Sequence, residues 1–357
     1  MRVLLSCGIN NLDIAQNERI VVVDTTKVED FYTVLLESTQ LIKNDLDSTF
    51  IEAFIETGEN IIDNGKIHIE NNLPKPETRD KLKKMYASLS IDDLSLEEKK
   101  KAIQMILINT VKEEQLQVNH QPTPDGIGVI LSYFIDLFYE KDEALHLADL
   151  SVGTGNLLYT LFTTLFSNNS KIKLTGVDND DLLISLASTV SGLLNIPIQL
   201  MHQDALQPLL LDPVDLMVSD LPIGYYPKDV DSDAFKTGFE EGYSYSHYLL
   251  IEQGFNYLKE NGYAFYLLPT NVFESEEVKS LLQYVHSVGH VQAIIHMPHE
   301  WFSSPKSRKS LFIVQKKGDQ SKQVSEVLVS TVPSLNDQNA FKEFILDIKE
   351  WKKDQQI

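Results

Sequence analysis

Apolar residues in the first third of the chain recur at intervals of three and four positions, which is the spacing of one helical face. The pattern is clear over residues 31–42 and again over 50–55, and it predicts two packed helices. Ser95 followed by Glu98 forms a capping box, which predicts the start of a third helix. Residues 29–117 are therefore expected to form a helical lobe.

The pattern changes after residue 118, where short apolar runs begin to alternate with amphipathic segments. Two prolines in HQPTPD, residues 120–125, break the helical pattern, and Asp125 can cap a helix predicted over 127–139. Regular alternation of strands and helices is typical of a parallel, doubly wound sheet that binds its ligand beyond the carboxyl ends of the strands. No helix separates the last two predicted strands, so these two are expected to pair antiparallel.

The predicted elements divide the chain into three regions: a mainly helical region at 1–118, a sheet domain at 119–330 and a helical tail at 331–357. In the first region, residues 1–28 show one strand-like run, at 19–23, and no other clear period. Strands are expected at 145–150, 173–178, 196–202, 214–219, 263–268, 291–297 and 310–316. Helices are expected near Leu157, Leu182, Tyr245 and Glu276, and over 339–353.

The charge balance is strongly acidic, with 31 Lys and Arg against 52 Asp and Glu and a formal net charge of −21. Such a surface repels phosphate at long range, so a nucleic acid would have to meet a local basic patch. Residues 305–322 either contact phosphate locally or form a solvated loop, and the second interpretation is the simpler one. The basic residues of this segment are Lys306, Arg308, Lys309, Lys316, Lys317 and Lys322, against the single acid Asp319.

A single cysteine, Cys7, excludes an internal disulfide framework and a cysteine zinc cluster, and it suits a reducing cytosol. His120, His202, His247, His296 and His299 show no H-x-x-x-H or similar spacing, so no metal site is expected. The apolar run before Cys7 is too short for a signal sequence, and no apolar stretch approaches the roughly 18 residues of a membrane span. A cytoplasmic protein without membrane contact is expected.

The segment LADLSVGTGNLL, residues 147–158, is an apolar run that ends in a glycine-containing loop. Gly153 and Gly155 lack a Cβ atom, so the backbone there can adopt positive φ and approach a ligand closely. The helix expected from Asn156 would present free N–H groups to the same place. Strand, tight turn and helix in this order favour a nucleotide-type site, although G-x-G also occurs in ordinary turns.

Acidic residues follow the ends of three successive predicted strands, and a parallel topology would place them at one edge of the sheet. Asp178 lies 25 residues after Gly153, near the roughly 20-residue spacing at which an acid binds the ribose hydroxyls of a nucleotide. Asp204 can accept a hydrogen bond from an adenine amino group, and Asp220 is the third acid. The alternative for Asp178 and Asp204 is an ordinary turn or strand-end aspartate.

The order and content of these segments resemble class I S-adenosylmethionine-dependent methyltransferases, over roughly residues 119–317. HQPTPD is similar to the family's Q-x-x-T-P motif, and DLSVGTGNLL to D-P-A-C-G-T-G-x-x-L, with Leu-Ser-Val in place of Pro-Ala-Cys. GVDND resembles the ribose motif and QDAL the adenine-side motif. More closely, the chain resembles N6-adenine DNA methyltransferases related to type I modification subunits, with the gamma order of motifs. The nearest resemblance is to a stand-alone bacterial branch with a helical N-terminal lobe.

The resemblance implies an α/β fold, namely a Rossmann-like class I methyltransferase sheet of seven mostly parallel strands with an N-terminal helical domain. It also implies S-adenosylmethionine as the cofactor. The cofactor-binding residues that it implies are Gln121, Thr123, Pro124, Asp149, Gly153, Thr154, Gly155, Asn156, Leu157, Asp178, Asn179, Asp204, Ala205 and Asp220.

The family's catalytic motif, N/D-P-P-F/Y, is altered here to Asp-Leu-Pro-Ile at residues 220–223. The Asp220 carboxylate would accept a hydrogen bond from an acceptor amino group and favour a pyramidal, nucleophilic nitrogen. Ile223 has no π face to stack on an extruded base, a contact worth ~1–3 kcal/mol. Tyr225 and Tyr226 either replace it or are turn tyrosines packed on the sheet. The resemblance thus implies Asp220, Pro222 and Tyr225 as catalytic residues.

Three functions remain open. The first is adenine-N6 methylation of DNA, the second is methylation of an amino group in RNA or a protein amide, and the third is a catalytically degenerate cofactor-binding scaffold. Only about 40 residues follow the last predicted strand, so no target-recognition domain is expected there. If DNA is the substrate, a protein partner is expected to supply target recognition.

Overall fold

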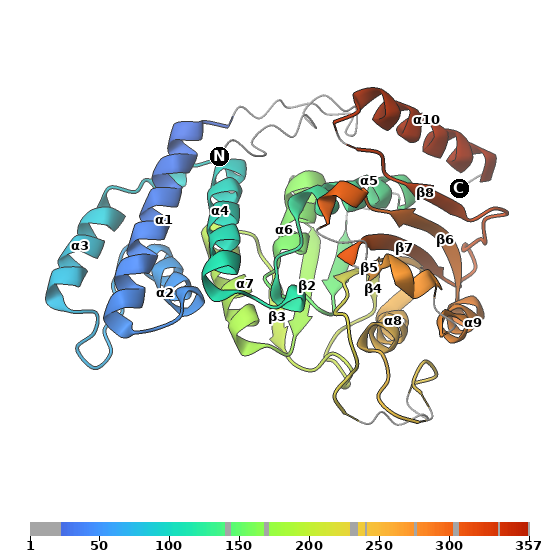
Figure 1. The fold of residues 1–357 in the computed structure, drawn as a ribbon, viewed down its shortest axis with the longest axis horizontal. Coiled ribbons are helices and arrows are strands. Elements are labelled where there is room, and N and C mark those ends of the chain that lie inside the picture. Colours follow the sequence, from blue (N-terminus) through green and yellow to red (C-terminus); the bar gives the residue numbers. More distant parts are fainter. Residues whose placement is uncertain are drawn as a thin grey trace. The chain divides into compact units, whose positions relative to one another are not determined.

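The computed structural model describes residues 23–139, 144–167, 171–228, 235–239, 241–274, 277–302, 307–334 and 336–355. The chain forms two compact units, both drawn in Figure 1. The first, called the sheet unit, comprises Val129–Ser151 and Ala205–Ile357, and the second, called the helical unit, comprises Val21–Gly128 and Val152–Asp204. Cys7, Glu276, Lys306 and most of the run predicted at 19–23 lie outside the described residues.

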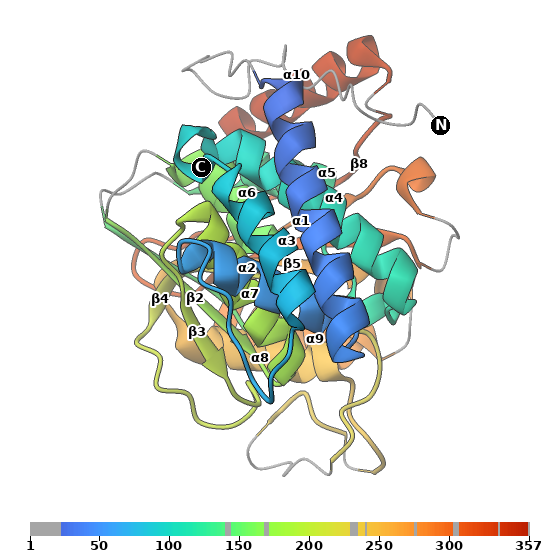
Figure 2. The same cartoon turned by 90° about the vertical axis from the view of Figure 1, so that its left-hand side faces the viewer.

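The predicted helical lobe is present in the helical unit. Its α-helices are α1 (Thr25–Leu46), α2 (Phe50–Ile62), α3 (Pro76–Ala87) and α4 (Leu96–Glu114). Capping boxes begin α2 and α4, and the one at α4 is the predicted pair Ser95 and Glu98. Helix α1 packs against α2, α3 and α4, and Figure 2 shows α1 and α3 nearest the viewer with α2 and α7 behind them.

Helix α3 was not predicted from the sequence, and its composition explains why. Pro76 occupies its first turn, where the missing N–H costs nothing, but the helix is polar on most sides. Only Leu82 and Tyr86 are buried, so the three-and-four spacing of an apolar face is nearly absent.

The rest of the helical unit alternates helix and strand, as the sequence predicts. Its elements are α6 (Asn156–Leu161), β2 (Ile172–Asp178), α7 (Asp181–Leu194) and β3 (Gln199–His202). Strands β2 and β3 pair in parallel. Helix α2 packs closely on α7, and this contact leaves no room for a side chain at Gly58. A Cβ atom added there would lie 2.2 Å from Cγ2 of Thr189. The helical lobe is therefore packed on the β2–α7–β3 segment.

The sheet unit contains six described strands in the order β1-β4-β5-β7-β6-β8. They are β1 (Leu145–Asp149), β4 (Val214–Asp220), β5 (Leu258–Pro269), β6 (Gly289–His296), β7 (Lys309–Lys316) and β8 (Leu328–Thr331). Strand β4 is parallel to both β1 and β5, and β7 is antiparallel to β5 and β6. The antiparallel pair predicted at the end of the sheet is confirmed.

The described residues thus contain eight strands, one more than the seven predicted. The additional strand, β8, pairs in parallel with β6. It has four residues that alternate between partly exposed and exposed, so it has no buried face.

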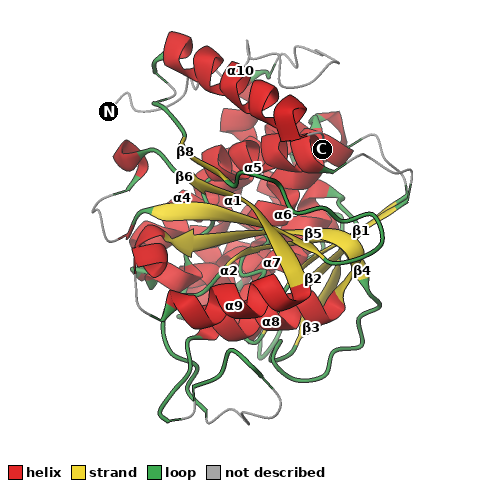
Figure 3. Ribbon diagram, turned by 90° about the vertical axis from the view of Figure 1, so that its right-hand side faces the viewer, coloured by secondary structure: helices red, strands yellow, loops and turns green. Residues whose placement is uncertain are grey.

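Helices cover both faces of the sheet in the sheet unit (Figure 3). Helices α8 (Ser246–Tyr257) and α9 (Val278–Val288) lie on one face, and α10 (Gln338–Gln355) lies over the other together with α5 (Asp125–Phe138) from residue 129 onward. The Phe138 and Trp351 rings are 5.9 Å apart, and Lys352 donates to the carbonyl oxygen of Leu137, which ties α10 to α5. Among the described helices, none is long and apolar enough to cross a membrane.

Candidate functional site

In the sheet unit, the ends of β1 and β4 are joined by a buried hydrogen-bond network around Asp149. The Ser219 hydroxyl donates to the Asp149 carboxylate, which also accepts from the N–H of Ser151 at 2.9 Å. The Leu150 N–H in turn donates to the Ser219 hydroxyl at 3.2 Å. Asp149 is buried, so this carboxylate shapes the start of the loop that follows β1.

Asp220, the predicted catalytic acid, is the last residue of β4 and forms an ion pair with Lys309. Both side chains are largely buried, with 13% of the Asp220 side chain and 18% of the Lys309 side chain exposed. In the sequence Lys309 is one of several basic residues of the segment 305–322, and no role beside Asp220 was predicted for it. No local signal could have revealed it, because the two residues lie 89 positions apart.

The loop after Asp220 turns back so that Tyr225 lies beside Tyr245. The Tyr226 N–H donates to the Ser244 carbonyl at 2.8 Å, and the Ser246 N–H donates to the Gly224 carbonyl at 3.0 Å. The Tyr225 and Tyr245 rings stack at a centroid distance of 4.8 Å and an interplanar angle of 16°. With 59% of Tyr225 exposed, the ring is fixed on one side and accessible elsewhere. This arrangement suits a stacking surface for a planar ligand.

His247 continues this stack on Tyr245, with ring centroids 5.2 Å apart. Burial lowers the pKa of His247 to about 4, so the imidazole is neutral near pH 7. A hydrogen bond joins the Tyr225 and Tyr245 hydroxyls at 3.5 Å, and this contact is the main cause that raises the pKa of Tyr245 to about 12. The Tyr245 and His247 rings therefore carry no charge at neutral pH.

In the helical unit, Asp178 holds the glycine loop. The Gly153 N–H donates to Oδ2 of Asp178 at 2.8 Å, and the Asp180 N–H donates to Oδ1 at 3.1 Å. Gly153 and Gly155 have φ values of +53° and +79°, as predicted for this loop. A side chain at Gly155 would also collide with the Tyr159 ring, whose Cε2 would lie 2.5 Å from the added Cβ. Burial raises the pKa of Asp178, with backbone hydrogen bonds opposing the effect.

The T-P-D segment is attached to the first turn of α6 through Asn156. The Asn156 amide donates to the carbonyl oxygen of Thr123 at 2.7 Å and to Oδ1 of Asp125 at 2.8 Å. Lys100, on α4 of the helical lobe, forms an ion pair with Oδ2 of Asp125 at 2.5 Å. Asp125, predicted only as a helix cap, thus connects the lobe to the residue that follows the glycine loop.

Three further predicted site residues have hydrogen bonds or packing contacts within their own unit. Gln121 donates to the Leu116 carbonyl at 3.1 Å, and Leu157 is buried in the core of its unit. The Ala205 carbonyl accepts from Gln253 at 2.7 Å. The predicted gathering of Asp178 and Asp204 with Asp220 involves both units and stays a prediction.

The basic segment is tied to backbone carbonyl oxygens. The Lys316 ammonium donates to the Phe255 and Leu258 carbonyls at 2.6 Å each, at the end of α8, and Lys317 donates to carbonyls at the end of α9. Arg308 donates to the Met297 carbonyl at 2.8 Å. Cations are favoured at helix carboxyl ends, so Lys316 and Lys317 have a structural role that was not predicted from the sequence.

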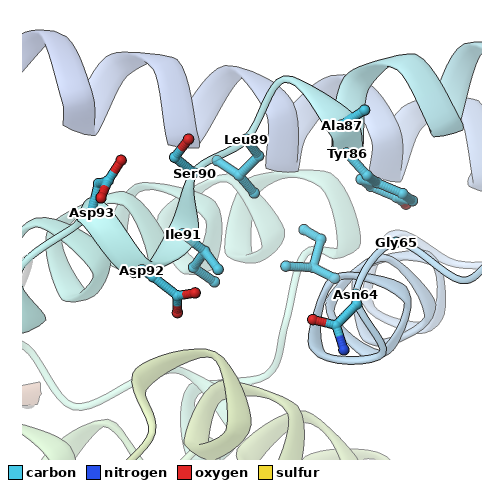
Figure 4. A pocket seen from close by; sticks show the side chains of 10 residues that line it. Asn64, Gly65, Tyr86, Ala87, Leu89, Ser90, Ile91, Asp92 and Asp93 are labelled. Atoms are coloured by element: carbon cyan, nitrogen blue, oxygen red, sulfur yellow. The ribbon is translucent and has the colours of Figure 1, made fainter.

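A cavity of about 450 Å³ lies in the helical lobe, and none of the residues that line it is a predicted site residue (Figure 4). Its lining comprises Ile61, Asn64, Gly65, Tyr86, Ala87, Leu89, Ser90, Ile91, Asp92 and Asp93. Among the described residues, no cluster of His, Cys, Asp and Glu has the arrangement of a metal site.

The fold and these motifs define a class I methyltransferase, and known proteins identify the family. Residues 29–111 match the YtxK N-terminal helical domain, and residues 106–355 match N-6 DNA Methylase. The chain is 32% identical over 322 residues to the uncharacterized protein YtxK of Bacillus subtilis, a match that covers 90% of this chain and 96% of that protein. The chain therefore belongs to the N-6 DNA methylase family and carries a YtxK-type helical domain.

Two solved structures support the fold assignment. A protein of Listeria monocytogenes, assigned to the class I S-adenosylmethionine-dependent methyltransferases, is 35% identical with a TM-score of 0.84, and the match covers 92% of this chain and 99% of that one. A type I restriction-modification methyltransferase subunit of Streptococcus thermophilus is 16% identical with a TM-score of 0.62, covering 92% and 73%. The predicted family resemblance and fold class are confirmed.

Proposed function

We propose that the protein is an S-adenosylmethionine-dependent methyltransferase that methylates the exocyclic amino nitrogen of adenine in DNA. The observation that carries the proposal is the Asp-Leu-Pro segment at 220–222, which stands at the end of β4 and is followed by the exposed, stacked ring of Tyr225. A carboxylate and an aromatic face are the two features that an adenine N-methyltransferase needs for its acceptor.

The residues of the helical unit suit S-adenosylmethionine. The glycine loop has positive φ at Gly153 and Gly155, and its backbone is fixed by the Asp178 carboxylate. A carboxylate has about four lone-pair positions, so Asp178 can hold the loop and also accept from ribose hydroxyls. Asn156 and Thr123 would keep the adjoining segment in place. The cofactor, when bound, supplies the electrophilic methyl group.

At the acceptor, Asp220 would receive a hydrogen bond from the amino group and draw its lone pair away from the ring. Pro222 restricts the backbone of the loop, and a nearby backbone carbonyl would accept a second hydrogen bond from the amino group. Tyr225 would take over the stacking role that Ile223 cannot fill. Because the Tyr225 ring is already held against Tyr245, little conformational entropy is lost when a base stacks on it.

Two observations favour a protein amide as the acceptor over a nucleic acid, because RNA carries the same phosphate charge as DNA. The formal charge is −21, and Lys316 and Lys317 are engaged with helix ends instead of facing a phosphate backbone. The isolated protein would therefore bind and methylate DNA weakly, and a partner would supply recognition of a particular target sequence. The fold shared with a type I restriction-modification methyltransferase subunit supports proposing a protein partner.

One assay separates these possibilities. The protein is incubated with methyl-labelled S-adenosylmethionine and, separately, with genomic DNA, total RNA and cell protein, while calorimetry measures binding of the cofactor. Label in N6-methyladenine of DNA is the expected result. Label in RNA or protein alone would replace the proposed substrate, and micromolar cofactor binding without any transfer would leave only the scaffold function.

A further inference from the structure

Lys309 is the ion-pair partner of Asp220, the proposed catalytic carboxylate. Lys309 is the first residue of β7, which runs antiparallel to β5, whereas β4 runs parallel to β5. The start of β7 and the end of β4 therefore lie at the same edge of the sheet. Lys309 pairs in register with Pro269, and Asp220 pairs with Leu267, so the lysine side chain reaches across the end of β5 to the carboxylate.

The backbone around Lys309 is held on both sides. Arg308 donates to the Met297 carbonyl at 2.8 Å, and the Ser310 hydroxyl bonds His296 at 2.7 Å and Thr270 at 2.8 Å. With only 18% of its side chain exposed, Lys309 has little water around its ammonium group. The cation is thus a fixed feature of this edge.

An acceptor amino group that binds Asp220 must share or displace this contact. A buried ammonium that loses part of its hydrogen bonding costs free energy, unless the incoming molecule offers an acceptor atom in return. The ion pair presents an acceptor, Asp220, directly beside a donor, Lys309. The chemical group that matches this pair is an amino group, as donor, on a carbon atom that also bears an acceptor, either a ring nitrogen or a carbonyl oxygen. An aminopyrimidine ring and a primary amide both have this arrangement.

We propose that Lys309 is a specificity-determining residue that donates a hydrogen bond to the acceptor atom adjacent to the methylated amino group. This inference rests on the proposed function, because it assigns Lys309 to the same acceptor site. Adenine fits, since its amino group lies beside the ring nitrogens N1 and N7. A primary alkylamine does not fit, because it lacks the adjacent acceptor and its positive charge would face Lys309.

The test uses single-stranded oligonucleotides, so that the energy of base extrusion does not enter the comparison. Three substrates of identical sequence carry adenine, 1-deazaadenine or 7-deazaadenine at the target position. Wild-type protein and the variants Lys309→Met, Lys309→Arg and Lys317→Met are compared by kcat/KM. Lys317 donates to carbonyls at the end of α9, so Lys317→Met is a matched loss of one lysine outside the site.

Wild-type protein is expected to disfavour one of the two deaza substrates by about tenfold to a hundredfold, the range for a lost hydrogen bond to a charged group. Lys309→Met should methylate that substrate and adenine at equal rates, while Lys309→Arg and Lys317→Met keep the wild-type ratio. Because Lys309→Met removes the cation beside a largely buried carboxylate, thermal unfolding is measured in parallel, and Lys309→Arg tests the donor without removing the charge.

Unchanged discrimination in Lys309→Met, or equal rates on all three substrates by wild-type protein, would overturn the assignment of Lys309 and leave the proposed function standing. Wild-type protein that binds S-adenosylmethionine but methylates none of the oligonucleotides would overturn the proposed function, and this inference with it. Loss of discrimination in Lys309→Arg would also contradict the inference, because arginine retains donors at this position.

Discussion

Single residues decide which parts of the candidate site were predictable. Gly153 and Gly155 belong to a short motif, and both have the positive φ that the motif predicts, whereas the hydrogen bond from the Gly153 N–H to Asp178 was not predicted. Asp125 and Lys309 were seen in the sequence but received no functional role, because their partners come from distant segments. A side-chain contact of that kind depends on the tertiary fold and leaves no local pattern.

Asp220 is expected to be needed for methyl transfer and to contribute little to the affinity for the cofactor. Asp220→Ala should abolish methyl transfer while leaving affinity for S-adenosylmethionine within about threefold, because the carboxylate bonds the acceptor and strengthens that bond toward the transition state. Asp220→Asn is the matched control, since the family motif admits Asn or Asp and the amide keeps an acceptor oxygen. Single-turnover rates and calorimetry measure the two quantities. Equal losses in rate and affinity in Asp220→Ala would contradict this role.

His247 should make the protein less stable in acid. Burial lowers its pKa from 6.5 to about 4, so between these values the unfolded chain binds a proton that the folded protein does not. Stability therefore falls as pH decreases from about 6.5 to 4, by an amount on the order of 3 kcal/mol from this group. His247→Phe keeps a stacked ring and removes the titration. Denaturant unfolding at pH 7 and pH 5 should show a smaller acid loss in the variant, and an unchanged loss would rule out His247 as its source.

At the scale of elements, burial determined what the sequence could reveal. Strands β4 and β7 each contain a short buried apolar run, and their predicted bounds are within one residue of the observed ones. Helix α3 and strand β8 were missed, because the first buries only two side chains and the second alternates without a buried face. Such elements gain their stability from neighbours, which a pattern along one segment does not show.

The contact between α2 and α7 should depend on the absence of a side chain at Gly58. Gly58→Ala would place a Cβ atom 2.2 Å from Thr189 Cγ2, and overpacking of this kind costs roughly 1–3 kcal/mol. Thr189→Ser removes that methyl group, so the double variant should recover most of the loss. Urea unfolding of the single and double variants measures the coupling. If the stability losses of the two single variants simply add in the double variant, the contact with the Thr189 methyl group is not what destabilises Gly58→Ala.

Helix α4 should support the cofactor site through one ion pair. Lys100→Met removes the cation that pairs with Asp125, which orients Asn156 next to the glycine loop, and cofactor affinity is expected to fall about tenfold, or ~1.4 kcal/mol. Lys43→Met is the matched control in the same unit, because the Lys43–Glu113 pair is more exposed and such pairs contribute ~0–1 kcal/mol. Calorimetry with S-adenosylmethionine compares them. Similar affinities for the two variants would show that the lobe does not act through Lys100.

At the scale of the whole molecule, the net charge and the hydrogen bonds of the basic residues to backbone carbonyls both weaken binding to DNA. A chain with a formal charge of −21 repels DNA at long range, and lowering the salt strengthens that repulsion. Release of counterions from phosphates has the opposite dependence, with a slope of roughly −0.9 in log K per phosphate contact. Because Arg308, Lys316 and Lys317 are engaged with backbone carbonyls, few such contacts are available from this segment.

DNA binding by the isolated protein is therefore expected to be weak and nearly independent of salt. Between about 200 and 50 mM salt the affinity for a duplex oligonucleotide should change by less than about tenfold, whereas roughly six to ten phosphate contacts would change it by about 10³ to 10⁵. Fluorescence anisotropy over a series of salt concentrations gives the slope, and Lys317→Met should leave it unchanged. A slope steeper than about −3 would mean that a basic surface of this chain meets the phosphates directly, and target recognition would then not require a partner to supply that charge.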